Sequence, residues 1–320
     1  MPDSSPQPSK ILPSGEQHEI ASGNQVAVIS EVGATLRSYQ VGGRDIIDGF
    51  AADECASGGR GQILCPWPNR LRDGKYVFKG VQCQAAIDEP AFNNAIHGLV
   101  RWNRWQLVQR AQNRAKFEYI IFPQPGFRWT LKILVTYTLS VEGLVIETEA
   151  INVGELEMPF GIGFHPYLKL DPNGIDSLYL TIPAKRRLIS DSRMIPIGSE
   201  TVDGTLYDFS QGAPLGGVTG ISRLDTCFFD LIRDENGISR CRLESEGKEN
   251  FVELWADRSF SYYMIYTGDT LANIEERRRS VAIEPMSCPP NALQSLEDIV
   301  TLAPGSSWFG KWGIHSSGTR

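Results

Sequence analysis

Short stretches in which apolar and polar residues alternate run through almost the whole chain, and they constrain its fold more than any other feature. In Leu131–Leu139 every second residue, beginning with the first, is large and apolar or aromatic, whereas Lys132, Thr136 and Thr138 lie between them. This period of two is typical of a β-strand with one buried face. No stretch keeps apolar residues at helical spacing over more than roughly ten residues. The pattern therefore predicts an all-β fold.

Many further strands are predicted, separated by turns. Leu144–Asn152 follows Leu131–Leu139 after a Val-Glu-Gly turn, which predicts a hairpin. The other predicted strands are Gln25–Ile29, Gly33–Tyr39, Arg44–Ile47, Lys116–Phe122, Ser177–Ile182, Thr226–Ile232, Ser239–Ser245, Asn250–Trp255, Tyr262–Thr267, Val281–Glu284 and Trp308–Ile314. Residues 50–62 are small, polar and glycine-rich, which indicates a loop, and Asp269–Arg278 is interpreted as one or two helical turns. Together these elements predict one large antiparallel β-sandwich, wider than an immunoglobulin domain.

The domain boundaries follow from composition. Residues 1–15 are rich in proline and serine and are predicted to form a disordered tail, and residues 316–320 a C-terminal tail. Residues 20–315 show no repeat and no linker with a shift in composition, so we expect residues 16–315 to form a single domain. The net charge is −7 and no basic run exceeds Arg277–Arg279, which argues against nucleic acid as a partner. No signal-peptide core and no membrane-spanning apolar run is seen, so no membrane partner is expected.

Six cysteines are scattered through the chain without a CxxC pair. In a chain of this length they indicate separate thiols rather than a disulfide framework or a zinc site, and we expect a cytoplasmic protein. A disulfide between Cys55 and Cys65 stays open at this stage. The sequence also leaves the oligomeric state open, between a monomer and a weak homodimer.

Two residues able to transfer protons stand directly before a proline, His165 in Gly-Phe-His-Pro-Tyr-Leu and Glu284 in Ala-Ile-Glu-Pro-Met. Proline drives the preceding residue toward extended backbone and cannot donate to a sheet. Each side chain is therefore expected on a stiff segment where a regular strand is interrupted. Such stiffness suits a catalytic group, because small displacements change proton-transfer rates. Both residues also fit an ordinary position at a strand end.

Three other polar stretches are unusual for plain β packing: Cys65-Pro-Trp-Pro-Asn69-Arg70, Asn93-Asn94-Ala-Ile-His97-Gly98 and Arg223-Leu-Asp225. Together with the two His/Glu-Pro motifs, these stretches supply one arginine, two histidines and two acids, a set of residues suited to proton transfer. Taken singly, each histidine also fits a buried structural role, and Arg70 and Asp225 fit a structural ion pair. The other two histidines, His18 and His315, are interpreted as solvated surface residues. Aromatic residues that lie close by in sequence, and that would suit the apolar face of a pyranose, are Trp67, Trp102, Trp105, Phe160, Phe164 and Tyr167.

In order and approximate spacing, these motifs resemble those of the aldose 1-epimerases, the galactose mutarotase-like proteins. The resemblance covers about residues 16–315 and includes Tyr266-Thr-Gly-Asp-Thr270 and Leu302-Ala-Pro-Gly305. It implies a β-supersandwich with few short helices, an open carbohydrate cleft, a sugar substrate, and neither metal nor organic cofactor. The implied catalytic and sugar-binding residues are Glu284 as the base at the anomeric hydroxyl, His165 as the acid at the ring oxygen, His97 near that oxygen, and Asn69, Arg70, Asp225 and Asn94 on the sugar hydroxyls.

The chemistry agrees with these roles. Opening a hemiacetal needs a base at O1 and an acid at O5, and unperturbed pKa values of about 4.3 for Glu and 6.5 for His suit Glu284 and His165. Three rivals remain: a sugar-binding protein without turnover, a jelly-roll metal enzyme that uses His97, His165 and Glu284, and an epimerase of a hexose 6-phosphate or other modified sugar. For a phosphate, Arg60, Arg72 or Arg277–Arg279 would have to supply the cations. A neutral aldohexose such as galactose or glucose is the preferred substrate.

Overall fold

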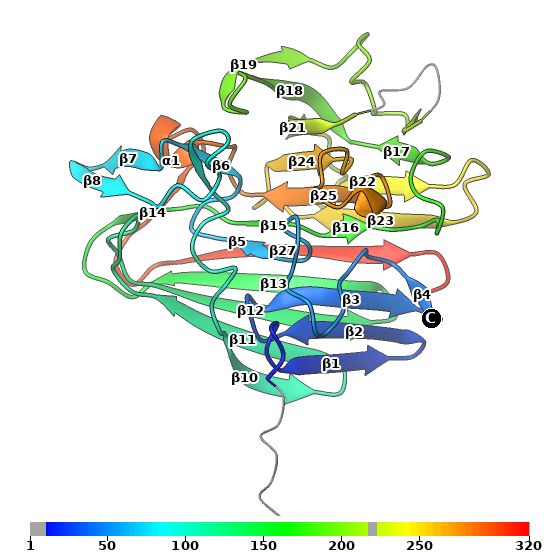
Figure 1. The fold of residues 1–320 in the computed structure, drawn as a ribbon, viewed down its shortest axis with the longest axis horizontal. Helices are drawn as coiled ribbons and strands as arrows, with labels where there is room; N and C mark the ends of the chain where they lie inside the picture. The colour runs from blue at the N-terminus through cyan, green and yellow to red at the C-terminus, as the bar shows by residue number, and fades with distance from the viewer. Residues whose placement is uncertain (1–10, 217–222, 320) are drawn as a thin grey trace, which may run out of the picture.

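The computed structural model describes residues 11–216 and 223–319. The predicted all-β fold is confirmed, because strands dominate and the described residues hold just one α-helix, α1 (Ala292–Ser295), and one 3₁₀ turn, η1 (Ile274–Glu276). Figure 1 shows broad antiparallel sheets stacked face to face. No helix in the described ranges has the length and apolar character needed to cross a membrane.

The largest sheet contains the strongest predicted strands. In spatial order its strands are β10 (Gln106–Ala111), β11 (Arg114–Ile121), β12 (Leu131–Ser140), β13 (Gly143–Asn152), β27 (Ser307–Ser316), β23 (Phe251–Ala256), β22 (Ser239–Glu244), β17 (Tyr179–Thr181) and β20 (Ala213–Pro214). The predicted hairpin is confirmed, since Ser140 pairs with Gly143. Along β12 the alternate positions from Leu131 to Leu139 are all buried, as the period of two requires.

Two further sheets pack over this one (Figure 1). The first, which carries the candidate site, runs β19 (Pro196–Thr201), β18 (Ala184–Ser190), β21 (Asp225–Leu231), β24 (Tyr262–Tyr266), β25 (Val281–Met286), β15 (Gly163–Phe164) and β5 (Ile63–Leu64), with β16 (Tyr167–Leu168) also paired to β25. The second runs β1 (Gln17–Ser22), β2 (Gln25–Ser30), β3 (Thr35–Val41) and β4 (Arg44–Asp45).

Buried contacts join these layers. The Tyr263 hydroxyl on β24 donates to the carbonyl oxygen of Ser239 on β22 at 3.1 Å, and the rings of Phe164 and Trp312 lie 5.0 Å apart. Three short pairs complete the fold: β6 (Arg70–Arg72) with β9 (Asn94–Ile96), β7 (Lys75–Phe78) with β8 (Val81–Gln84), and β14 (Met158–Phe160) with β26 (Val300–Leu302). Aromatic side chains thus fill the space between sheets and fix their spacing.

Every strand named from the sequence exists, to within two residues at each end. Of the helical turns predicted in Asp269–Arg278, the structure contains the single 3₁₀ turn η1. All six cysteines are free thiols, so Cys55 and Cys65 form no disulfide.

Several boundary predictions need correction. Residues 1–10 of the predicted N-terminal tail lie outside the described residues, but Ser14 is buried and its hydroxyl donates to the Ala52 carbonyl oxygen. The predicted C-terminal tail is likewise too long, because Ser316 belongs to β27 and is buried. His18 is buried in β1 against Phe117, and His315 is half-buried in β27, so neither is a freely solvated residue.

Candidate active site

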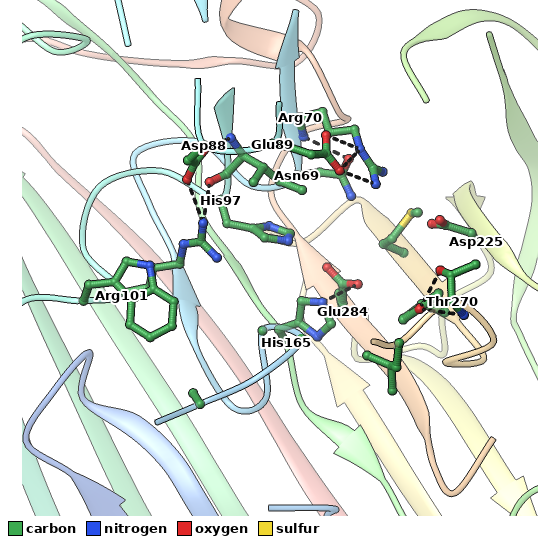
Figure 2. Close-up of a pocket in the computed structure, with 18 residues that line it drawn as sticks. Asn69, Arg70, Asp88, Glu89, His97, Arg101, His165, Asp225, Thr270 and Glu284 are labelled. Atoms are coloured by element: carbon green, nitrogen blue, oxygen red, sulfur yellow. Dashed lines mark hydrogen bonds and ion pairs between the residues drawn. The ribbon is translucent and has the colours of Figure 1, made fainter. Parts of the chain in front are cut away.

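A cavity of about 300 Å³ opens on the sheet that contains β21, β24 and β25. Six of the seven sequence-predicted site residues line it: Asn69, Arg70, His97, His165, Asp225 and Glu284. Figure 2 shows their side chains converging on this hollow from loops and strands far apart in the sequence. The size and the polar lining suit a small hydrophilic molecule.

The pairing of three short strands brings the histidine and the glutamate together. Gly163 on β15 pairs with Met286, and Tyr167 on β16 pairs with Ala282, both on β25. His165, midway between β15 and β16, therefore lies opposite Glu284. Residues directly opposite each other in an antiparallel pair project from the same face. The strand is interrupted at His165 as expected, whereas Glu284 lies inside the continuous strand β25.

His165 and Glu284 contact each other directly. Nε2 of the imidazole is 3.2 Å from Oε1 of the carboxylate, and the side chains are just 6 % and 3 % exposed (Figure 2). The second oxygen, Oε2 of Glu284, is buried and has no hydrogen-bond partner among the described residues. An unsatisfied buried oxygen costs about 1–3 kcal/mol, so this atom favours a ligand that donates a hydrogen bond.

His97 reaches the same cavity from the end of β9. β6 pairs with β9, and the His97 backbone N–H donates to the Asn69 carbonyl oxygen at 2.9 Å. The next residue, Gly98, has φ +72, and a Cβ there would lie 2.1 Å from the Cys65 carbonyl oxygen, so glycine is required. The imidazole of His97 lies edge-on to that of His165, with ring centroids 5.4 Å apart.

Arg70 and Asp225 form the opposite wall. The Arg70 guanidinium donates to both oxygens of Glu89, with Nη2 at 2.9 Å from Oε1, so its partner is Glu89 rather than Asp225. Asp225 begins β21, which is separated from β25 by β24 alone; on β24, Tyr266 lies opposite Asp225 and Met264 lies opposite Glu284. The structural Arg70–Asp225 ion pair considered from the sequence is therefore wrong.

Asn94 does not line the cavity. Its side chain is fully buried and its amide nitrogen donates to Oε2 of Glu89 at 3.1 Å and to the Arg193 carbonyl oxygen at 3.0 Å. Direct contact with a sugar hydroxyl is excluded by this position. Asn94 instead holds Glu89, which in turn orients Arg70.

Burial moves the pKa values of the central pair in opposite directions. Burial, together with the nearby negative charge of Asp225, raises the pKa of Glu284 well above its usual value, and Arg70 partly opposes this. Burial and the positive charges of Arg60 and Arg101 lower the pKa of His165 to about 3, and a hydrogen bond with its own backbone partly opposes this. The unperturbed values used in the sequence analysis therefore do not hold. The shifts make Glu284 a stronger base, and a protonated His165 a stronger acid.

The neighbouring groups titrate abnormally too. Burial, reinforced by the charge on a protonated His165, lowers the pKa of His97 well below the usual imidazole value. Burial also raises the pKa of Asp225. His97 is therefore a neutral imidazole at physiological pH, able to donate or accept a hydrogen bond without carrying charge.

Several lining residues escaped the sequence analysis. Asp88 and Glu89 precede Pro90 in an irregular loop, and Nη2 of Arg101 lies 2.7 Å from Oδ2 of Asp88. Of the aromatic residues proposed for the sugar face, Trp102 alone lines the cavity, where it is 53 % exposed. The others are buried: Trp67, Trp105, Phe160, Phe164 and Tyr167. An aromatic residue next to a motif in sequence gives no signal of which face it occupies.

Metal ligation was also considered for this set of residues. Within the described ranges, no group of three or more His, Cys, Asp or Glu side chains is arranged to hold a metal ion, and His97, His165 and Glu284 form no such group. The donor arrangement required by the jelly-roll metal enzyme is thus missing from this part of the chain.

Comparison with known proteins gives a consistent result. A model of the aldose 1-epimerase family matches residues 16–315, nearly the whole chain. The Escherichia coli K12 protein YihR, described as uncharacterized, is 29 % identical over 293 residues, which cover 91 % of this chain and 90 % of YihR.

Solved structures share the fold at lower identity. The GalM/aldose epimerase homologue from C. elegans superposes with a TM-score of 0.83 at 22 % identity, covering 95 % of this chain and 99 % of that one. Galactose 1-epimerase from Lactobacillus acidophilus NCFM gives a TM-score of 0.74 at 19 % identity, covering 94 % and 95 %. These likenesses confirm the predicted galactose mutarotase-like fold.

Proposed function

Because the chain belongs to the aldose 1-epimerase family, we propose that it interconverts the α- and β-anomers of a free aldohexose such as galactose or glucose. The observation that carries the proposal is the 3.2 Å contact between Nε2 of His165 and Oε1 of Glu284 on the wall of a polar cavity. O1 and O5 of a hexose are both bonded to C1. The acid and the base that serve them therefore have to be neighbours.

The reaction follows from the proton content of this pair. In the reactive state Glu284 is a carboxylate and His165 an imidazolium. Glu284 takes the O1 proton while His165 gives its proton to O5, the C1–O5 bond breaks, and a C1 aldehyde forms. Rotation about C1–C2 presents the other carbonyl face, and the same transfers in reverse close the ring. The pair holds one proton throughout, and general acid–base catalysis of this kind contributes on the order of 10²–10⁴-fold per group.

The pKa shifts support this direction of transfer. Burial raises the pKa of Glu284 and lowers that of His165. During ring opening Glu284 gains a proton and His165 loses one, so both groups end in the uncharged form that burial favours. The remaining lining groups, Asn69, His97 and Asp225, are proposed to bind ring hydroxyls or O5, together with Arg70. Asn94 is proposed to act through Glu89 and Arg70 rather than on the sugar.

The charges around the cavity favour a neutral sugar. Both arginines that line it, Arg70 and Arg101, are already paired with carboxylates, Glu89 and Asp88. The arginines considered for a phosphate do not line the cavity: Arg60, Arg72, Arg277, Arg278 and Arg279. A phosphate would meet more carboxylates than unpaired cations, which disfavours its binding. Galactose is one candidate substrate, since a galactose 1-epimerase is among the proteins of this fold.

The substrate is tested by exchange NMR between anomers across free, phosphorylated and sulfonated hexoses. We expect rapid exchange for a free aldohexose and at least a tenfold lower rate for the 6-phosphate, which corresponds to about 1.4 kcal/mol. Faster exchange for a phosphorylated or sulfonated sugar would overturn the neutral-sugar assignment. Activity retained after dialysis against a chelator is the expected result for a site without metal.

The variant His165→Asn distinguishes the epimerase from a sugar-binding protein without turnover. This change should leave sugar affinity nearly intact and collapse anomer exchange. Equal exchange rates in the variant and the wild type would rule out His165 as the acid. Binding without measurable exchange in the wild type would favour the non-catalytic reading.

A further inference from the structure

The imidazole of His165 is not held by the hydrogen bond that usually orients a catalytic histidine. Its Nδ1 atom is buried and forms no hydrogen bond with any other residue in the part of the chain that the structure describes, so its own backbone is the one polar group set against the ring there. Histidines that move protons are ordinarily fixed by a hydrogen bond from the second ring nitrogen to a carbonyl or carboxylate. Because Nε2 has to point at one oxygen of Glu284, other contacts have to prevent the ring from turning.

Tyr167 supplies such a contact on the ring face. Its phenol ring stacks on the imidazole with centroids 5.0 Å apart and planes inclined by 18°. The Tyr167 hydroxyl donates to the Gly58 carbonyl oxygen at 2.7 Å. The next residue, Gly59, packs so closely that a Cβ there would lie 2.6 Å from Cδ2 of His165. Tyr167 therefore contacts the imidazole directly and also anchors the loop that packs against it.

Arg60 packs against the same tyrosine ring. Its guanidinium carbon is 4.8 Å from the Tyr167 ring centroid, and its side chain is 1 % exposed. Two carboxylates hold it, Asp48 at 3.3 Å and Glu276 at 2.9 Å. The backbone N–H of Asp48 donates to the Tyr167 carbonyl oxygen at 2.8 Å. Arginine and tyrosine are thus tied together by side-chain and backbone contacts.

We propose that Tyr167 and Arg60 are positioning residues for His165, through a stack that replaces a hydrogen bond from another residue at Nδ1. This inference rests on the proposed epimerase function for its kinetic part. Neither side chain lines the cavity, so neither contacts the sugar. Stacking fixes the plane of the imidazole, and the anchored Gly58–Gly59 loop limits its sliding within that plane. Aromatic pairs of this kind contribute about 0.5–1.5 kcal/mol beyond the area they bury.

The charge of Arg60 adds an electrostatic role. The charged and titratable groups around His165 are Glu284, His97, Tyr167, Arg60 and Arg101. After burial, the two arginines are what lowers the pKa of His165. Loss of the Arg60 charge should therefore let His165 bind a proton at higher pH.

The kinetic test compares Tyr167→Leu with Tyr167→Phe. Leucine removes the ring, and phenylalanine keeps the stack while losing the bond to Gly58. We expect kcat to fall about 100-fold in the leucine variant with KM within about threefold of wild type, since misplacement by about 1 Å has this size of effect. The phenylalanine variant should keep kcat within about tenfold. Affinity for a sugar analogue without O1, measured by calorimetry, should be unchanged in both.

A second readout does not depend on turnover. NMR titration of ¹⁵N-labelled histidine should show His165 taking up a proton at higher pH in Arg60→Met than in the wild type, and the acid limb of kcat/KM should move the same way.

The proposal is overturned if the leucine variant keeps the kcat of the phenylalanine variant, if analogue affinity falls in parallel with kcat, or if the titration does not move. If Tyr167→Leu fails to fold, the titration of His165 in Arg60→Met alone decides whether the proposal holds. If the wild type interconverts no aldose, the proposed function fails while this titration still tests the stack.

Discussion

Gly59 offers a way to displace the imidazole of His165, the proposed acid, without changing it chemically. It has φ +82, and a Cβ on it would lie 2.6 Å from Cδ2 and 2.9 Å from Nε2 of His165. Ordinary contacts begin at 3.4 Å, so in Gly59→Ala either the imidazole or the loop has to move by about 1 Å. Nε2 is the atom that contacts Glu284 at 3.2 Å, so the proton-transfer geometry changes directly.

Two costs have to be separated in this variant. An L-residue with left-handed backbone costs about 1–2 kcal/mol of stability wherever it occurs. The chain offers a matched control in Gly80, in the turn between β7 and β8, which also has φ +82 but no atom within 4 Å of an added Cβ. Gly80→Ala therefore carries the same backbone cost and displaces nothing. A misplacement of about 1 Å at the reacting groups costs on the order of 100-fold in rate.

The assay measures anomer exchange by NMR or polarimetry, together with the free energy of unfolding of both variants. We expect both to lose similar stability, with Gly80→Ala keeping full kcat and Gly59→Ala losing about 100-fold. If Gly59→Ala keeps kcat within twofold of the control, the imidazole is not confined as described. The reasoning from the 2.6 Å contact would then be refuted.

Three further predictions test the charges of the site. Glu284→Gln should lower kcat by about 10²–10⁴-fold in the exchange assay, because the amide cannot accept the O1 proton, and activity near wild type would contradict its role as base. In the pH profile of kcat/KM, activity is lost on the acid side when the pair gains a second proton, and since burial lowers the pKa of His165 to about 3, this acid limb should lie below about pH 4.3, where an unperturbed Glu would place it. On the alkaline side, the raised pKa of Glu284 keeps the pair's single proton bound to higher pH, so a bell-shaped profile bounded at about pH 4.3 and about pH 6.5, the ordinary Glu and His pKa values, would contradict both shifts. Glu89→Gln should raise KM about tenfold with kcat within about threefold, since Arg70 loses the carboxylate that orients it, whereas the control Glu200→Gln, which removes the partner of the remote Arg187, should leave both unchanged.

Long strands and motif residues could be predicted from the sequence because both signals are local. The alternation in Leu131–Leu139 needs no information from the rest of the chain, and β12 follows it. The short strands could not be found this way. β5, β15 and β16 have two residues each, and two residues cannot display a period. β15 and β16 pair with β25, which lies more than a hundred residues further along, and β5 pairs with β15.

The charged residues that support the site could not be predicted from the sequence, for a different reason. Asp88, Glu89 and Arg101 lie in irregular segments, where no periodicity marks which side chains point inward. Their role becomes visible when Arg70 is seen paired with Glu89 and Arg101 with Asp88. The pKa shifts likewise depend on burial that the sequence does not display. Reference pKa values therefore could not indicate how far the pKa of Glu284 or His165 is shifted.

The two His/Glu-Pro motifs act as one unit because of strand register. His165 and Glu284 lie opposite each other, and each is followed by a proline, Pro166 or Pro285, that cannot donate to the ladder. The strands are still joined beside the pair, since the Ile283 N–H donates to the Pro166 carbonyl oxygen at 3.2 Å. A slip of one residue would turn one of the two side chains to the other face of the sheet. The contact between His165 and Glu284 thus depends on a register that the surrounding sheet fixes, which is why neither motif indicates the pair by itself.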